Sequence, residues 1–260
     1  MASFGGCHDM SWSESFFPHF SVWQLVCTAL IFIWSGFVRS GLGFGGAALG
    51  LPFLLLVHDQ PIFWIPLIGL HLLFFSGLTL SNRLHNVDWS YLRSSARLIL
   101  PAAVAGVFGL LNLPNTILLL CIYSITLIYA LMWALDKAIQ SKHQWIDNLL
   151  LVFGGYVSGS SLTGAPLMIA VFMRHVALHQ LRDTLFVLWF IIVAFKLTAL
   201  FALEVPLHFM SALVLLPVAA IGHVVGLQTH DYLLKRDVLC RRLLGSLLTV
   251  VSLAGLWELL

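Results

Sequence analysis

Two positively charged residues stand within apolar parts of the sequence, where a charge is costly. Arg39 lies in a glycine-rich interruption between two apolar runs, and Lys196 lies well inside the apolar run 184–203. An arginine or lysine within a bilayer costs at least about 2.5–3.5 kcal/mol on insertion scales, so it needs a compensating partner. The acidic residues lie in loops or near the ends of the apolar runs. A small anion is therefore a candidate counter-charge for both cations.

Each cation also has a structural alternative. Arg39 is an ordinary positive surface residue if the two apolar runs beside it both cross the membrane fully. Lys196 could instead donate to a backbone carbonyl or to a helix end. His71 and His223 also lie in apolar runs, where either could relay a proton or simply form a hydrogen bond within the helix packing.

Small and hydroxyl-bearing residues mark two interruptions of the apolar runs. In the second interruption, Thr163 is expected to cap a helix whose first turn holds Pro166. A helix N-terminus points free N–H groups toward an anion. The alternative is that the small residues only allow close helix packing. The residues expected to bind a substrate are Arg39, Gly43, Gly45, Gly46, Ser160, Ser161, Thr163, Gly164 and Lys196.

The composition requires a membrane environment. Of the 260 residues, 60% are hydrophobic and 9% are charged, and the mean hydropathy is +0.98. A soluble domain of this length needs a mostly polar surface. The apolar runs are continuous rather than alternating, which predicts helices and not a barrel. The expected fold class is therefore all-α, in a polytopic integral membrane protein.

Several function classes lack the motifs that they require. The net charge of +2 gives no basic footprint for nucleic acid. The four cysteines form no CxxC or Cys/His cluster, so no metal site is predicted. No Walker motif is present, and no cofactor is expected. No HExxH or paired-aspartate motif occurs, so no catalytic residues are predicted, and an intramembrane enzyme is the least favoured alternative.

The apolar runs predict ten helical segments. They cover 20–38, 41–57, 62–80, 98–113, 115–135, 148–162, 164–178, 184–203, 209–228 and 243–260. A full span needs about 20 apolar residues, and the pairs on either side of Gly41 and Gly164 contain segments that are shorter. The sequence leaves open whether 20–57 and 148–178 are full spans or hairpins that turn at the midplane.

Lysine and arginine residues concentrate in four loops and are missing from the others. The basic loops are 81–97, 136–147, 174–183 and 229–242. The N-terminal region before Arg39 and the connections near 58–61, 112–115 and 204–208 contain neither residue. The positive-inside rule places the four basic loops in the cytoplasm and both termini outside.

Two pairs of stretches look alike and occur in the same order. Residues 35–46 line up with 154–165, and residues 100–106 line up with 216–222. The loop before the first copy of the second stretch is basic and its counterpart is not, so the copies are expected to be inverted. This predicts one compact membrane domain made of two repeats, 1–143 and 144–260, with the substrate near the midplane between them. The alternative is chance similarity among glycine- and leucine-rich helices.

A family resemblance rests on these glycine-rich motifs. Residues 40–52 resemble the first motif of the sulfite exporter TauE/SafE-type transporters, a family of membrane permeases, and 159–166 and 180–186 resemble its later counterpart and the stretch that follows. The resemblance covers roughly residues 20–255 and implies export or uptake of sulfite, sulfonates or related organic anions. The second motif is richer in serine and threonine than in glycine, and Arg39 stands beside the first motif. Both departures could signal a different anion.

We therefore expect a multi-pass permease for a small anion such as sulfite, a sulfonate or a related organosulfur oxyanion, working by alternating access between the repeats. The lipid bilayer is its expected environment, in a bacterial inner membrane. Coupling to protons or sodium and assembly as a homodimer are compatible with the sequence. The alternatives are an anion channel and a transporter of another small solute.

Overall fold

The computed structural model describes residues 17, 20–42, 45–137, 143–234 and 237–260, and all regular structure in these residues is helical. A short 3-10 turn, η1 (Leu84–Asn86), accompanies the α-helices. The α-helices are α2 (Val22–Gly41), α3 (Gly46–Val57), α4 (Pro61–Leu80), α5 (Trp89–Asn112), α6 (Asn115–Ala134), α7 (Gln144–Ser161), α8 (Ala165–His175), α9 (Leu178–Ala202), α10 (Phe209–Leu234) and α11 (Asp237–Glu258). The all-helical prediction is confirmed.

Each predicted apolar segment corresponds to one of these helices, but some helices begin earlier than predicted. The clearest difference is α5, which begins at Trp89 rather than at 98. The Asp88 side chain accepts a hydrogen bond from the backbone N of Tyr91 at 2.9 Å and so caps this helix. Hydropathy marks only the apolar part of a helix, whereas the capping residue fixes where the backbone becomes helical.

The helices fall into two groups by length: some are long enough to cross a lipid bilayer, and two are too short. In the described part of the chain, seven helices are long and apolar enough to cross a bilayer, namely α2, α4, α5, α6, α9, α10 and α11. By contrast, α3 has 12 residues and α8 has 11. Their lengths are roughly 18 Å and 17 Å, and the hydrocarbon core is about 30 Å thick. Neither helix is long enough to cross by itself, so α3 and α8 are the short arms of two hairpins, α2–α3 and α7–α8, whose turns we expect to lie within the membrane.

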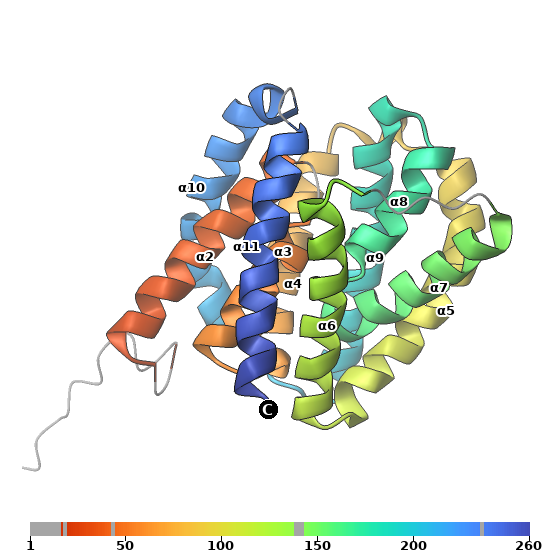
Figure 1. Cartoon of the computed structure of the whole chain (residues 1–260). Coiled ribbons are helices and arrows are strands. Elements are labelled where there is room, and N and C mark those ends of the chain that lie inside the picture. The colour runs from red at the N-terminus through yellow and green to blue at the C-terminus, as the bar shows by residue number, and fades with distance from the viewer. Residues whose placement is uncertain (1–16, 18–19, 43–44, 138–142, 235–236) are drawn as a thin grey trace, which may run out of the picture.

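The helix ends gather at two opposite ends of the molecule (Figure 1). The connections α4–α5 and α8–α9 lie at the upper end in this view, together with the C-terminal ends of α6 and α10. The connections α3–α4, α5–α6 and α9–α10 lie at the lower end with the C-terminus. The described parts of all four basic stretches are thus at the upper end, which the charge distribution predicts to be cytoplasmic. The two hairpins enter from opposite ends.

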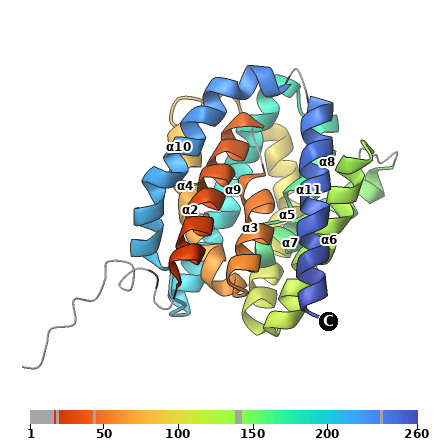
Figure 2. The same cartoon turned by 60° about the vertical axis from the view of Figure 1, so that its left-hand side comes forward.

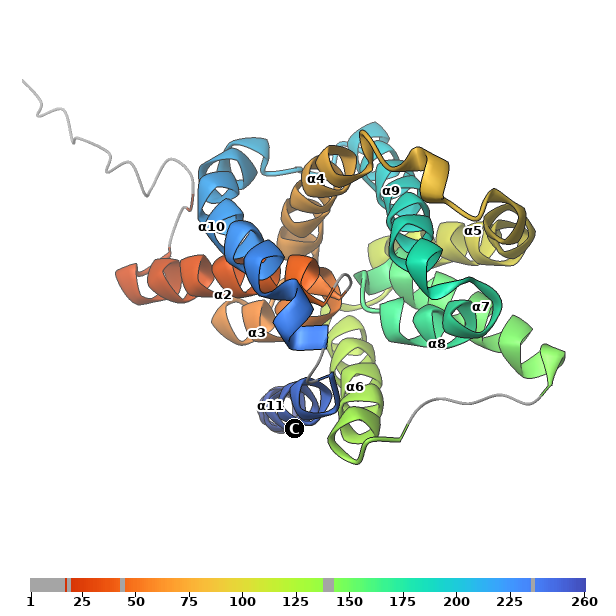
Figure 3. The same ribbon diagram turned by 90° about the horizontal axis from the view of Figure 1, so that it is seen from above.

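Helices that correspond in the two halves of the chain form equivalent packing pairs. α2 packs along α10, as α7 packs along α5, and α4 contacts α9 while α6 contacts α11. Figures 2 and 3 show α10 beside α2 and α11 beside α6 from two directions. This pattern is compatible with the predicted inverted repeat, which stays a prediction.

Two glycines hold equivalent helix pairs close together. A Cβ atom on Gly106 of α5 would overlap the carbonyl oxygen of Tyr156 in α7. A Cβ atom on Gly222 of α10 would overlap the carbonyl oxygen of Ile33 in α2. Each glycine therefore brings two backbones into contact, as small residues commonly do in membranes. These two tight pairs fix where the hairpin tips lie.

Candidate functional site

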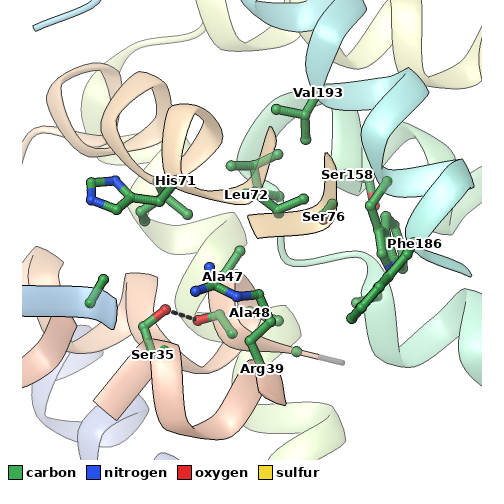
Figure 4. Close-up of a pocket in the computed structure, with 18 of the residues that line it drawn as sticks. Ser35, Arg39, Ala47, Ala48, His71, Leu72, Ser76, Ser158, Phe186 and Val193 are labelled. Carbon is green, nitrogen blue, oxygen red and sulfur yellow. Dashed lines mark hydrogen bonds between the residues drawn. The ribbon is translucent and has the colours of Figure 1, made fainter. Parts of the chain in front are cut away.

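A cavity lies where the α2–α3 hairpin faces α4 and α9 (Figure 4). Its volume is about 40 Å³, and one water molecule needs roughly 10–15 Å³ of such space. The cavity therefore has room for a solute of a few non-hydrogen atoms. Much of its wall is apolar, and its polar lining residues are Ser35, Arg39, His71, Ser76 and Ser158. No acidic residue lines it among the described residues.

Arg39 is the only side chain with a permanent charge among the described lining residues. It is 8% exposed and sits in the last turn of α2, where the negative end of the helix dipole favours a cation. Its guanidinium carbon lies 4.2 Å from the ring centre of Phe75, a cation–π contact. No described residue accepts a hydrogen bond from its Nε or Nη2 atoms, and no carboxylate of the described residues pairs with it.

Two buried hydroxyls face the same cavity without using their hydrogen-bonding capacity. Ser76 in α4 and Ser158 in α7 are each 1% exposed, and neither Oγ atom has a hydrogen-bond partner among the described residues. Buried polar atoms are nearly always paired. Three side chains around one cavity, Arg39 included, thus have polar atoms without a hydrogen-bond partner among the described residues, which makes the cavity a candidate site for a polar solute.

His71 adds a ring nitrogen to this wall. Its Nδ1 lies 2.8 Å from the carbonyl oxygen of Leu67, and because a carbonyl only accepts, Nδ1 carries the proton. The ring packs against Phe32, with 4.8 Å between the ring centres. The backbone contact fixes the ring, so His71 is rigidly placed in the cavity wall.

The tip of the first hairpin shapes the cavity from below. Gly45 has φ 82° and precedes α3, a backbone conformation that glycine adopts without strain. Gly46 lies against Ser35 and Arg39, with no room for a Cβ atom. Ser35 Oγ donates to the carbonyl oxygen of Gly46 at 2.8 Å and ties the two arms together. Both glycines line the cavity, whereas Gly43 lies outside the described residues.

The hydroxyl groups at the tip of the second hairpin form hydrogen bonds mainly with other residues of the same tip. Ser161 Oγ lies 2.7 Å from Thr163 Oγ1 and donates to the carbonyl oxygen of Val157 at 3.0 Å. Ser160 Oγ donates to the same carbonyl at 3.2 Å. Lys196 of α9 is fully buried, and its Nζ donates to the carbonyl oxygen of Ser158 at 2.8 Å. This cation therefore stabilises the C-terminal end of α7.

The comparison with known families adds the family assignment. A family model described as "Sulfite exporter TauE/SafE" matches residues 28–255. The chain belongs to the TauE/SafE family. It is therefore a membrane transporter. Comparisons with curated proteins and with solved structures gave no match.

The structure of this TauE/SafE transporter brings together only part of the predicted site. Arg39, Gly45, Gly46 and His71 line the cavity. The other described candidates, Ser160, Ser161, Thr163, Gly164, Lys196 and His223, are not among its lining residues. Thr163 was predicted to cap α8, and that prediction is wrong. The capping position is Gly164, with no side-chain hydrogen bond, because the chain needs a residue without a Cβ atom beside the backbone of α7.

Sequence reasoning missed Ser76 and Phe75, and it did not single out Ser158 within the second, hydroxyl-bearing interruption. Ser76 and Phe75 lie in α4, which reads as a continuous apolar helix without an interruption. A serine in such a helix normally bonds to its own backbone. The only signal was therefore the polarity of Ser76, and its missing partner is visible only in the structure.

Proposed function

We propose that this TauE/SafE transporter carries a small monovalent oxyanion through the cavity beside Arg39. Sulfite in its singly protonated form and short sulfonates belong to this class. The observation that carries the proposal is the buried guanidinium of Arg39, whose Nε and Nη2 atoms have no partner among the described residues. An uncompensated buried charge is strongly destabilising, and an anion in the cavity would remove that cost.

The remaining polar groups suit the same ligand. Hydroxyls donate hydrogen bonds to oxyanions, and Ser76 and Ser158 have unused Oγ atoms on the cavity wall. A guanidinium presents several N–H groups in a planar fork that matches an oxyanion. One guanidinium and no carboxylate among the described lining residues favour a single negative charge over two.

The fold offers a way to expose the cavity to each side in turn. The two hairpins enter from opposite ends, and the cavity includes Arg39 from the first and Ser158 from the second. Broken helices that meet at the midplane are a recurring transporter device, in which one part of the molecule rocks against the other. We propose that movement of the hairpins against α4 and α9 alternates the access.

The decisive experiment is uptake of radiolabelled sulfite into proteoliposomes. Competition with methanesulfonate, which carries one negative charge, with sulfoacetate, thiosulfate and sulfate, which carry two, with zwitterionic taurine and with a neutral solute would define the charge and shape that the site accepts. We expect saturable uptake, competition by singly charged sulfur oxyanions and no competition by the neutral solute. Sulfate should compete poorly because it carries two charges.

Arg39→Gln tests the site within the same assay. Loss of the guanidinium should lower sulfite uptake more than tenfold, because a charge-assisted contact made out of water is worth several kcal/mol, about 3–5 kcal/mol for a buried pair. Arg93→Gln is the matched control, since Arg93 lies exposed on α5. Equal uptake by the two variants, both monodisperse in detergent, would contradict the proposal.

A further inference from the structure

A second, smaller cavity adjoins the first. Its volume is about 10 Å³, which suffices for one water-sized group. Its polar lining residues are Arg39, Ser40, Thr79, Arg182 and His223. Arg39 and Phe186 line both cavities, so these two side chains form the boundary between them.

The second cavity lies nearer than the first to the basic end of the molecule, which the charge distribution predicts to be cytoplasmic. In α4, the central cavity is lined between Ile68 and Ser76, and the second cavity reaches Thr79, one residue before the helix ends at the upper end of the molecule. α9 starts at that end, and there the second cavity uses Arg182 whereas the central cavity extends to Val193.

α10 shows the same displacement. It contributes Ala219 to the central cavity and Leu227, two helical turns nearer its upper end, to the second. Eight residues of helix advance by about 12 Å. The lining residues in all three helices therefore place the second cavity between the central cavity and the basic end of the protein.

The second cavity is positively charged. Arg39 and Arg182 both line it, and no acidic residue does so among the described residues. The Nε of Arg182 lies 3.6 Å from a carboxylate oxygen of Asp183, and Arg83 lies 3.9 Å from the same carboxylate. Asp183 is therefore shared between two arginines, and only one of them faces the cavity.

The hydroxyl groups of Ser40 and Thr79 also line this cavity. The side chain of Ser40 contacts Nδ1 of His223, and Thr79 Oγ1 donates to the carbonyl oxygen of Phe75 at 2.8 Å. The hydroxyl of Ser40 also donates to the carbonyl oxygen of Gly36 at 3.1 Å. Both hydroxyls thus already donate to the backbone, and the charged donors that line this cavity are those of Arg39 and Arg182.

The opposite side of the central cavity has a different character. There an apolar cluster includes Phe17, Trp64, Leu197 and Leu200, and Phe63 packs against it. Phe63 and Trp64 pack edge to face, with 4.8 Å between their ring centres. His58 and His208 pack against its aromatic rings, but no charged residue belongs to the cluster. Among the described residues, the second cavity therefore extends the charged lining of the central cavity toward the basic end.

We infer that the Arg39–Arg182 cavity is a second anion site, which the transported oxyanion occupies between the central cavity and the cytoplasm. This rests on the proposed function, because the ligand is the same small oxyanion. Arg39 contacts the anion in both positions, and Arg182 provides the second charge on the cytoplasmic side. Because the cavity holds one water-sized group, an oxyanion enters it only when Phe186 or Phe75 moves aside.

The test measures sulfite affinity separately from the two faces of the membrane. Inside-out and right-side-out membrane vesicles containing the full chain would take up radiolabelled sulfite over a range of concentrations. Arg182→Gln should raise the half-saturating concentration about fivefold or more from the cytoplasmic face, because it removes a charged hydrogen-bond donor. From the other face the change should stay within about twofold. Arg182→Lys keeps a point charge and should recover part of the affinity.

Arg83→Gln is the matched control. It removes an arginine from the same carboxylate, that of Asp183, but Arg83 does not line the cavity. Its affinities should match those of the unmodified protein. If Arg182→Gln does not reach the membrane, Arg182→Lys serves instead, with a smaller expected rise of about threefold from the cytoplasmic face.

The outcomes separate this inference from the proposed function. A rise confined to the cytoplasmic face and absent in Arg83→Gln supports the second site. Saturable sulfite uptake with any other pattern overturns the second site and leaves the central site standing. Uptake that does not saturate in the unmodified protein, or that is unaffected by Arg39→Gln, overturns the proposed function and the second site with it.

Discussion

The two hairpins share one backbone arrangement but differ in the polar side chains near their breaks. Each has a longer helix, a break beside a glycine and a helix of 12 or 11 residues that turns back. In the predicted repeat, Arg39 of the first hairpin aligns with Ser158 of the second. The first hairpin thus carries its own cation and turns it toward the cavity. The second carries a hydroxyl there and takes a cation, Lys196, from α9.

This difference separates a binding element from a supporting one. In the first hairpin, a Ser35–Gly46 hydrogen bond joins the two arms, and the Nε and Nη2 atoms of Arg39 have no partner among the described residues. In the second hairpin, Lys196 bonds to the backbone carbonyl of Ser158, while the Ser158 hydroxyl lines the cavity without a partner in the described part of the chain. Two cations that look alike in the sequence therefore differ in what they contact, and of the two only Arg39 lines the central cavity.

The largest expected effect distinguishes the glycines of the two tips. In Gly164→Ala, the new Cβ would overlap the carbonyl oxygen of Gly154 and the side chain of Ser158, so we expect a loss of about 3 kcal/mol. In Gly45→Ala, the nearest atom is 3.5 Å away in Leu49, and only the left-handed backbone is penalised, by about 1 kcal/mol. Thermal unfolding in detergent would measure both. Equal midpoints for the two variants would refute the tighter packing of the second tip.

An effect of intermediate size should distinguish Lys196 from Arg39. Lys196→Met removes the bond to the Ser158 carbonyl and should lower the thermal midpoint, in keeping with a hydrogen bond to a charged group of about 1.5–3 kcal/mol. The half-saturating sulfite concentration of the protein that remains folded should stay within about twofold. Arg39→Gln should do the reverse, with uptake lost and the thermal midpoint unchanged or higher, because a buried charge is removed. A loss of uptake in Lys196→Met at an unchanged midpoint would instead place this lysine on the transport path.

The helices and the two breaks could be predicted from the sequence, because long apolar runs and glycine clusters are local signals. The depth of the two turns could be inferred only from the lengths of the helices in the structure, because α3 and α8 are too short to cross the bilayer. The inward faces could not be predicted. In a membrane, the lipid-facing and the core-facing sides of a helix such as α4 are both apolar. The hydropathy of α4 therefore did not indicate that Ser76 faces the cavity. In the same way, the hydropathy of α9 did not indicate which carbonyl Lys196 contacts.

The smallest expected effect compares two serines of the same hairpin. Ser158 Oγ has no partner among the described residues and lines the cavity, so Ser158→Ala should leave the thermal midpoint unchanged and weaken sulfite affinity about threefold. That is the size of one neutral hydrogen bond, about 0.5–1.5 kcal/mol. Ser161 bonds to Thr163 inside the tip, and Ser161→Ala leaves the buried Thr163 hydroxyl without that contact. This variant should lower the midpoint and keep the affinity. Identical behaviour of the two variants would mean that the second hairpin acts as one unit, with no division between its binding and supporting hydroxyls.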